Sequence, residues 1–295
     1  MSLTDGPGTR AARVRTSWPE RFFDAYVFDM DGTIYLGDEL LPGARRLVLE
    51  LRRREIPVRF LSNNPTKSPL QYSSKLEALG IPTPVGEIAN TVVTMTRWLQ
   101  TRCPGATVFP IAEQPLIKAF REAGIAMSED PADIDVVVAS YDRAFDYRKL
   151  QIAFDAIWFH KRAILVATNP DRFCPFPGGR GEPDCAAIVA AIEACTGATC
   201  QAVLGKPNPV MLEEAIGNLG VDVHRCVMVG DRLSTDVRMA VDARMASAMP
   251  LTGESTREDV AVLPSAERPT YVLDRVDRLI PESVWWELGW TEGED

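Results

Sequence analysis

Short apolar runs alternate with stretches of helical periodicity along most of this chain. The run at residues 25–28 is short, apolar and aromatic, as a buried strand is, whereas Leu47 and Leu51 stand four positions apart on one helix face. Strands are predicted at residues 25–28, 58–61, 108–111, 136–139, 164–167, 202–204 and 226–229. Helices are predicted at residues 43–54, 69–79, 114–123, 147–160, 185–195 and 210–219. Because strands alternate with helices, we expect an α/β fold with a parallel sheet covered by helices.

The pattern also suggests how the chain is divided into domains, since 295 residues is ample for two. The C-terminal tail holds Trp285, Trp286 and Trp290, which we expect to pack on the chain's own core. The alternative is that they form a surface for a partner. The predicted parts are a flexible leader (1–21), a first core segment (22–103), a second α/β domain (104–201), a second core segment (202–280) and the C-terminal tail (281–295).

Composition and charge narrow the function classes. Hydrophobic residues make up 46% and charged residues 25%, close to the average of soluble globular proteins, and no apolar run is long enough for a membrane helix. Residues 1–20 lack the apolar stretch of a secretory signal, so we expect a cytoplasmic protein. The net charge of −9 argues against a nucleic-acid partner. Six cysteines without a C-x-x-C pair, and only two histidines, argue against a zinc site.

Polar clusters follow three of the predicted strands. Asp29 and Asp31 come directly after residues 25–28, and residues two apart at a strand end can face the same point. Two neighbouring carboxylates repel each other unless a cation or a shared proton relieves them, and Mg²⁺ is the cation that prefers such oxygen ligands. An ordinary Asp-Gly turn is the alternative.

The other two clusters add groups that suit a phosphate. Ser62 and Asn63 end the run at 58–61, and Asp231 and Asp236 follow the run at 226–229. Lys206 lies between these two clusters in the sequence. Without the other motifs, Lys206 would be interpreted as a surface charge. Ser62 and Asn63 would likewise be interpreted as part of an ordinary loop. Because ligands of open α/β sheets bind at the carboxyl ends of the strands, we expect one pocket suited to phosphoryl transfer.

In their order, these motifs resemble those of the haloacid dehalogenase (HAD) superfamily of phosphatases. The matching elements are Asp-x-Asp-Gly-Thr, a strand-end Ser, a Lys and Gly-Asp-x(4)-Asp, between about Tyr26 and Gly253. The resemblance implies a Rossmann-like parallel-sheet core, an inserted α/β cap domain, and catalysis through an aspartyl-phosphate. It implies that Asp29 is the nucleophile and Asp31 the general acid and base.

The resemblance also implies roles for the remaining motif residues. Ser62 and Asn63 would hold the transferring phosphoryl group, and Lys206 would steady its charge and that of the nucleophile. Asp231 would complete an Mg²⁺ site together with Asp29 and the carbonyl of Asp31. Asp236 would orient the waters of the metal, or Lys206, without binding the ion directly.

Four further stretches resemble the NagD and 4-nitrophenylphosphatase branch of this superfamily. They are Gly32-Thr33-Ile34-Tyr35, Leu61-Ser62-Asn63-Asn64-Pro65, Ala167-Thr168-Asn169-Pro170-Asp171 and Leu204-Gly205-Lys206-Pro207. The branch implies a small phosphorylated metabolite as substrate, such as a sugar phosphate, phosphoglycolate, glycerol phosphate, a nucleotide or pyridoxal phosphate. Asn169 and Asp171 are expected to contact it from the cap, with a plain turn as the alternative. Related proteins often associate, which leaves a homodimer open.

The chain departs from the branch at several core positions. Arg244 stands where a glycine is usual, and Pro250 is expected to interrupt the last core strand. Both changes put the local backbone path in question, not the reaction.

Three other functions stay open. Hydrolytic dehalogenation needs neither Asp31 nor Asp231, and a phosphomutase fits the cap position poorly. A phospho-acceptor module that switches partners would share the acidic pocket but would need no second carboxylate beside the nucleophile.

Overall fold

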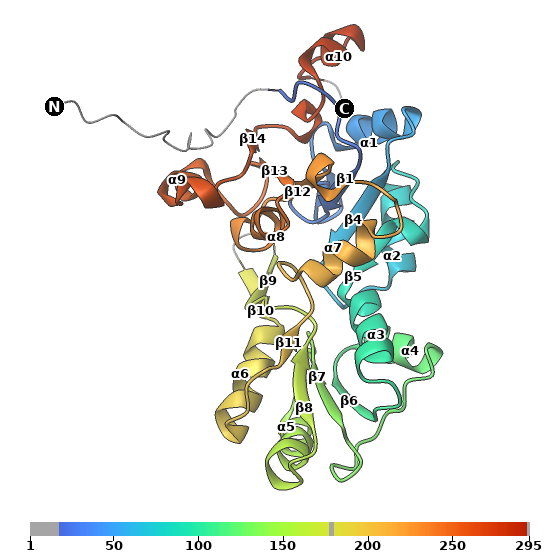
Figure 1. Cartoon of the computed structure of the whole chain (residues 1–295), viewed down its shortest axis with the longest axis vertical. Helices are drawn as coiled ribbons and strands as arrows, with labels where there is room; N and C mark the ends of the chain where they lie inside the picture. Colours follow the sequence, from blue (N-terminus) through green and yellow to red (C-terminus); the bar gives the residue numbers. More distant parts are fainter. Residues whose placement is uncertain (1–17, 177–179, 294–295) are drawn as a thin grey trace, which may run out of the picture.

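Two separate parallel sheets organise the chain, and Figure 1 shows them toward opposite ends of its long axis. The structure is a computed structural model that describes residues 18–176 and 180–293. One sheet has the order β14-β13-β12-β1-β4-β5, and the other has the order β11-β8-β7-β6. We call the first sheet and its helices the core, and the second sheet and its helices the cap. The α/β class predicted from the sequence is confirmed.

The elements of the core come from both halves of the chain. Its strands are β1 (Tyr26–Asp29), β4 (Val58–Ser62), β5 (Ile88–Asn90), β12 (Val227–Val229), β13 (Ala246–Pro250) and β14 (Tyr271–Leu273), with the small pair β2 (Tyr35–Leu36) and β3 (Glu39–Leu40) beside them. Its helices are α1 (Ala44–Arg53), α2 (Pro69–Ala78), α7 (Pro209–Ile216), α8 (Arg238–Asp242), α9 (Arg257–Val262) and α10 (Glu282–Glu287).

In the sequence, the elements of the cap lie between the two segments that form the core. Its strands are β6 (Val108–Ile111), β7 (Val136–Ala139), β8 (Ile164–Ala167) and β11 (Ala202–Val203), and a hairpin is formed by β9 (Phe173–Phe176) and β10 (Arg180–Pro183). Its helices are α3 (Thr91–Arg102), α4 (Gln114–Glu122), α5 (Tyr147–Phe154) and α6 (Cys185–Thr196). Short 3₁₀ turns lie at Val85–Glu87, Val223–Arg225, Ser265–Glu267 and Val276–Arg278, and π turns at Asp155–Phe159 and Leu233–Val237.

The central strand β1 is buried on both faces, and its side chains alternate between two hydrophobic clusters. Tyr26 and Phe28 pack with Leu47 and Leu51 of α1, whereas Val27 packs with residues of α7 and α8 on the other face. β1 pairs in parallel with β12 on one side and with β4 on the other. The chain runs outward from β1 in both directions, so the point where its course reverses lies between β1 and β12. Open α/β sheets bind ligands at such a point.

Most elements predicted from the hydrophobic pattern are confirmed, and the differences have local causes. The helix predicted over 147–160 ends as an α-helix at Phe154 and continues as a π turn. Pro250 does not interrupt its strand, because it is the last residue of β13 and lies beyond the last pair with β12, where its missing N–H costs no bond. The short strands β5 and β14 were not predicted.

The path of the backbone before β13 is kept despite the arginine at its turn. Arg244 has φ 54°, in the left-handed region that glycine adopts without strain. Its N–H donates to the carbonyl of Val241 at 3.0 Å, and the N–H of Met245 donates to the carbonyl of Ala240 at 2.8 Å. These bonds close α8 as a glycine would.

Helix α3 belongs with the cap by its packing. Val92, Met95 and Leu99 lie in one cluster with Phe120 of α4 and with strands of the second sheet. The boundary predicted after residue 103 would assign this helix to the core. The domain limits stay a prediction, and the packing favours a cap that begins at α3.

The tryptophan-rich tail docks on the core, as the sequence analysis expected. Trp285 is 2% exposed and lies 5.0 Å from Trp18 and 5.4 Å from Trp290, measured between ring centroids. The guanidinium of Arg46 lies 4.6 Å from the centroid of the Trp285 ring. Of the predicted leader, residues 1–17 lie outside the described residues. Among the described residues, no helix combines the length and the apolar character needed to cross a membrane.

Replacing Trp285 by alanine tests this docking. Because the ring is buried among aromatic neighbours, we expect Trp285→Ala to lower the free energy of unfolding by about 3–5 kcal/mol. Trp286, which is 65% exposed, is the matched control, and Trp286→Ala should change it by less than about 0.5 kcal/mol. Denaturant unfolding followed by far-UV circular dichroism measures both. Equal, small effects of the two substitutions would contradict the docking.

Candidate active site

The sheet brings the predicted polar clusters to one edge. Asp29 is the last residue of β1, Ser62 is the last residue of β4, and Asp231 comes two residues after β12 ends. These three strands are neighbours and run in parallel, so their carboxyl ends lie at the same edge. Lys206 lies in the segment that leads from the cap strand β11 back to the core.

Three carboxylates and one ammonium group meet there. Single carboxylate oxygens of Asp29, Asp231 and Asp236 all lie within 4.8 Å of one another, and all three residues are buried. Lys206 Nζ forms an ion pair with Asp29 Oδ1 and lies 2.7 Å from Asp236 Oδ1. When all four groups are ionised, three negative charges against one positive charge leave two uncompensated. A divalent cation would balance them.

The crowding of like charges shifts the pKa values of the buried carboxyl groups. Burial raises the pKa of Asp29 far above that of an ordinary aspartate; the Lys206 ammonium opposes the rise, and Asp236 and Asp231 add to it. Burial and the charge of Asp236 raise the pKa of Asp231 to about 6. Burial lowers the pKa of Lys206, but the carboxylates of Asp236 and Asp29 outweigh burial, so its pKa lies above the usual value and the ammonium stays charged.

The surroundings of Asp231 fit a metal ligand. Its Oδ2 accepts a hydrogen bond from the Glu254 N–H at 2.7 Å, whereas its Oδ1 is buried and has no hydrogen-bond partner among the described residues. An unpaired buried carboxylate oxygen is costly, and a cation would satisfy it. Gly32 has φ +86°, and a Cβ at this position would lie 2.7 Å from Asp231 Oδ2, so only glycine fits here. Hard oxygen donors of this kind suit Mg²⁺.

Asp31 is set apart from this cluster. Its carboxylate is not among the three that converge, and the residue is exposed, so a substrate can reach it. Partial desolvation raises its pKa, while the positive charges of Lys75 and Lys67 oppose the rise. A carboxyl group with a raised pKa retains its proton to higher pH, which is the property that a general acid needs.

The side chain of Asn63 is committed to holding Lys206. Its Oδ1 accepts a hydrogen bond from the Lys206 N–H at 2.7 Å, and its Nδ2 donates to the Lys206 carbonyl at 3.1 Å. The same Nδ2 donates to Asp171 Oδ2 at 3.0 Å. The phosphate-binding role expected for Asn63 is therefore open to its backbone and not to its side chain.

Ser62 is oriented by helix α2. Ser68 begins this helix with a capping box, in which its Oγ accepts from the Gln71 N–H at 3.3 Å and Gln71 Oε1 accepts from the Ser68 N–H at 2.8 Å. The buried Tyr72 follows, and its hydroxyl lies 3.0 Å from Ser62 Oγ. The hydroxyl of Ser62 is thus held at the strand end.

The two cap residues predicted to contact substrate bind protein groups. Asn169 is fully buried; its Oδ1 accepts from the Thr168 hydroxyl at 2.7 Å, and its Nδ2 donates to Asp171 Oδ2 at 2.9 Å and to Asp184 Oδ1 at 3.1 Å. These contacts argue against the substrate contact expected for Asn169, since its polar side-chain atoms are buried and bonded to protein groups. Asp171 accepts three hydrogen bonds from protein side chains, which argues against the same role.

Two residues of this network were not identified from the sequence. Arg232 Nη1 donates to Asp171 Oδ1 at 3.2 Å, and its Nε lies 3.0 Å from Glu254 Oε2. Its position directly after Asp231 is the sequence signal that would have found it. Asp184 was missed because it is the residue that caps α6, a role that many aspartates have.

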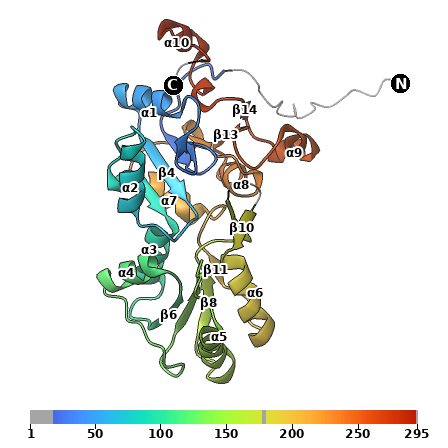
Figure 2. The same cartoon turned by 180° about the vertical axis from the view of Figure 1, so that it is seen from behind.

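The hairpin β9–β10 brings the cap to the catalytic edge. Its strand β9 begins two residues after Asp171, whose carboxylate accepts hydrogen bonds from Asn63 and Arg232 of the core. Burial raises the pKa of Cys174 on β9 to about 11, and the charges of Asp184 and Asp31 raise it as well. Both Figure 1 and Figure 2 show the hairpin between α8 and α6, at the junction of core and cap. On its other strand, Glu182 Oε2 lies 2.8 Å from Arg143 Nε.

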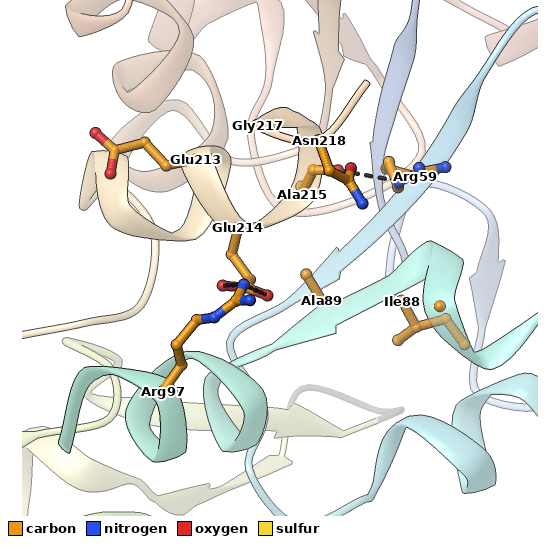
Figure 3. A pocket seen from close by; sticks show the side chains of 10 residues that line it. Arg59, Ile88, Ala89, Arg97, Glu213, Glu214, Ala215, Gly217 and Asn218 are labelled. Atoms are coloured by element: carbon orange, nitrogen blue, oxygen red, sulfur yellow. Dashed lines mark hydrogen bonds and ion pairs between the residues drawn. The ribbon is translucent and has the colours of Figure 1, made fainter. Parts of the chain in front are cut away.

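A separate pocket of about 360 Å³ lies elsewhere, between α3, α7 and the strands β4 and β5 (Figure 3). Arg97 Nη1 of α3 forms an ion pair with Glu214 Oε2 of α7 at 2.6 Å, and Arg59 Nε donates to the Ala215 carbonyl at 3.0 Å. The residues that line it include none of the acidic cluster. We therefore place the candidate active site at the strand ends and not in this pocket.

Comparisons with known proteins identify the family to which the chain belongs. The family model of the haloacid dehalogenase-like hydrolases matches residues 26–126, and a second HAD-hydrolase-like model matches residues 203–279. An acid sugar phosphatase of Staphylococcus aureus is 33% identical over 81% of this chain and 90% of its own length.

Solved structures show the same fold. The 4-nitrophenylphosphatase of Thermotoga maritima superposes with a TM-score of 0.81 at 32% identity, over 88% of this chain and 96% of that one. The p-nitrophenyl phosphatase of Archaeoglobus fulgidus superposes with a TM-score of 0.80 at 27% identity, over 88% and 98%. NagD of Escherichia coli, at 23% identity, shares the fold with a TM-score of 0.77 over 87% and 98%. The chain therefore belongs to the haloacid dehalogenase-like hydrolase family and is a phosphatase of that family.

Proposed function

We propose that this phosphatase hydrolyses the phosphate monoester of a small metabolite, with Mg²⁺ and through a phosphoryl group carried by Asp29. The observation that supports this most is the convergence of Asp29, Asp231 and Asp236 around Lys206 at the carboxyl ends of the strands. Phosphate monoesters hydrolyse extremely slowly without a catalyst, so a dense set of charges is the expected solution.

The chemistry divides into two displacements. An oxygen of Asp29 attacks phosphorus while the bond to the leaving oxygen breaks, and Asp31 gives its proton to that oxygen. A water molecule then attacks phosphorus, Asp31 takes a proton from it, and the bond to Asp29 breaks to release inorganic phosphate. The Lys206 ammonium offsets negative charge in both steps.

The chain's own groups divide the work of binding. Asp29 and Asp231 would hold Mg²⁺, which neutralises charge on the phosphoryl oxygens when bound. Asp236 keeps Lys206 in place through its ion pair at 2.7 Å. The Ser62 hydroxyl and the Asn63 backbone N–H would bind the phosphoryl oxygens, as groups at a strand end do.

The relatives favour a sugar phosphate among the candidate substrates. The curated relative is named an acid sugar phosphatase, and the structural relatives from Thermotoga maritima and Archaeoglobus fulgidus are named for 4-nitrophenyl phosphate. Phosphoglycolate, glycerol phosphate, nucleotides and pyridoxal phosphate are further candidates. The hairpin β9–β10 would distinguish among them, because it begins two residues after Asp171, which is hydrogen-bonded to Asn63 and Arg232 of the core. Such metabolites are cytoplasmic solutes, so we propose a cytoplasmic enzyme; the homodimer stays a prediction.

Turnover of 4-nitrophenyl phosphate tests the proposal. We expect sustained hydrolysis with Mg²⁺, loss of hydrolysis with a chelator, and its return when Mg²⁺ is restored. Asp29→Asn should be inactive because the amide lacks the nucleophilic charge, whereas Asp133→Asn, at an exposed cap position, should match the wild type. Accumulation of one equivalent of stable phosphoprotein, without turnover, would instead support a phospho-acceptor module.

The leaving group tests the role of Asp31. A sugar alkoxide needs a proton to leave, whereas 4-nitrophenolate leaves without one. Asp31→Asn should therefore lower kcat/KM, which reports the first displacement, by about 10²–10⁴-fold for a sugar phosphate and by clearly less for 4-nitrophenyl phosphate. Steady-state rates on both substrates give the ratio of the two losses. An equal loss of kcat/KM on the two substrates would rule out proton donation by Asp31.

A further inference from the structure

The Asp171 carboxylate is the meeting point of core and cap. Its Oδ2 accepts hydrogen bonds from Asn63 Nδ2 at 3.0 Å and from Asn169 Nδ2 at 2.9 Å. Its Oδ1 accepts from Arg232 Nη1 at 3.2 Å. Asn63 and Arg232 belong to the core and Asn169 to the cap, and the Asp171 side chain is only 11% exposed. One carboxylate therefore satisfies three donors from three segments of the chain.

The cap side of this junction is rigid. Asn169 is fully buried and all of its polar side-chain atoms are hydrogen-bonded. Its Nδ2 also donates to Asp184, which caps the first turn of α6 through the Cys185 N–H. The position of Asp171 is thus set by the end of β8 and the start of α6.

The core side leads directly to the catalytic lysine. Asn63 makes two hydrogen bonds with the backbone of Lys206, whose ammonium pairs with Asp29 and Asp236. Gly205 passes through this junction so closely that a Cβ would lie 2.7 Å from Asn63 Oδ1. A shift of Asn63 would therefore move the backbone that carries the lysine.

We propose that Asp171 is a positioning residue that couples the placement of the cap to the placement of Lys206, through Asn63, and to Arg232 beside Asp231. The proposal rests on the phosphatase function proposed above. It replaces a substrate contact by Asp171 with an indirect role: the residue orients catalytic groups and does not touch the substrate.

An amide at this position cannot do what the carboxylate does. A carboxylate only accepts hydrogen bonds, and all three neighbours are donors. In Asp171→Asn, a single acceptor oxygen can serve either the two amides or the guanidinium, and the new NH₂ group faces a donor on the other side. The substitution keeps the size of the side chain, so it changes the hydrogen bonds with little change in packing.

Kinetics on two substrates test the proposal. For Asp171→Asn we expect kcat to fall by about 10- to 100-fold, because small displacements of catalytic groups cost this much. The loss should be the same for 4-nitrophenyl phosphate and glucose 6-phosphate, with KM changing by less than about threefold on each. Assays run well below the thermal midpoint of each variant keep loss of folding from lowering the rate.

Hydrogen–deuterium exchange supplies a readout that does not depend on turnover. The Lys206 N–H donates to Asn63, so the peptide that contains Gly205 and Lys206 should exchange faster in Asp171→Asn than in the wild type. Asp133→Asn, which removes an exposed cap carboxylate, is the matched control and should change neither kcat nor exchange. If Asp171→Asn does not fold, Asp171→Ser takes its place, since it keeps one acceptor without an opposing NH₂ group.

Two results would overturn the proposal. One is a kcat within twofold of the wild type together with unchanged exchange at Lys206. The other is a loss that appears in KM and differs between the two substrates, which would make Asp171 a substrate contact. If the wild type hydrolyses neither substrate, the proposed function fails, and the exchange measurement alone then decides the role of Asp171.

Discussion

The ion pair of the buried Lys206 with Asp29 and Asp236 is the main electrostatic interaction of the strand-end site. Burying three carboxylates at one strand edge is unfavourable, because each is desolvated and each repels the others. The ammonium compensates one charge, and a divalent ion would balance the remaining two. The charged groups that stabilise a transferring phosphoryl group are therefore in place before a substrate binds, as preorganised catalysis requires.

The surrounding architecture serves this interaction. β1, β4 and β12 are adjacent in one parallel sheet, so residues far apart in sequence end at the same edge. Lys206 comes from the segment that returns from the cap, and Asn63 fixes its backbone. Because the Asn63 side chain also donates to Asp171, the placement of the cap is linked to the placement of the lysine. A large inserted domain can thus affect the chemistry without supplying a catalytic group.

Much of the fold and of the acidic cluster could be predicted from the sequence, because strand-end carboxylates are a local pattern. The run at 25–28 followed by Asp29 identifies both the strand and its polar end, and the position of Lys206 followed from the resemblance. The partners of Asn63 could not be predicted, since its choice of Lys206 over a phosphate depends on a contact 143 residues away. β14 has only three residues, too few for a periodic signal, and the packing of α3 on the cap depends on tertiary contacts.

In the proposed mechanism Asp29 and Asp231 share one divalent ion, which calorimetric titration of the substrate-free protein with Mg²⁺ would detect. We expect the wild type to bind one Mg²⁺ per chain. Asp231→Asn should weaken binding by at least about tenfold, because Asp231 Oδ1 has no hydrogen-bond partner among the described residues and is free to ligate the ion. Unchanged affinity in this variant, or no binding by the wild type, would show that Asp29 and Asp231 do not share an ion.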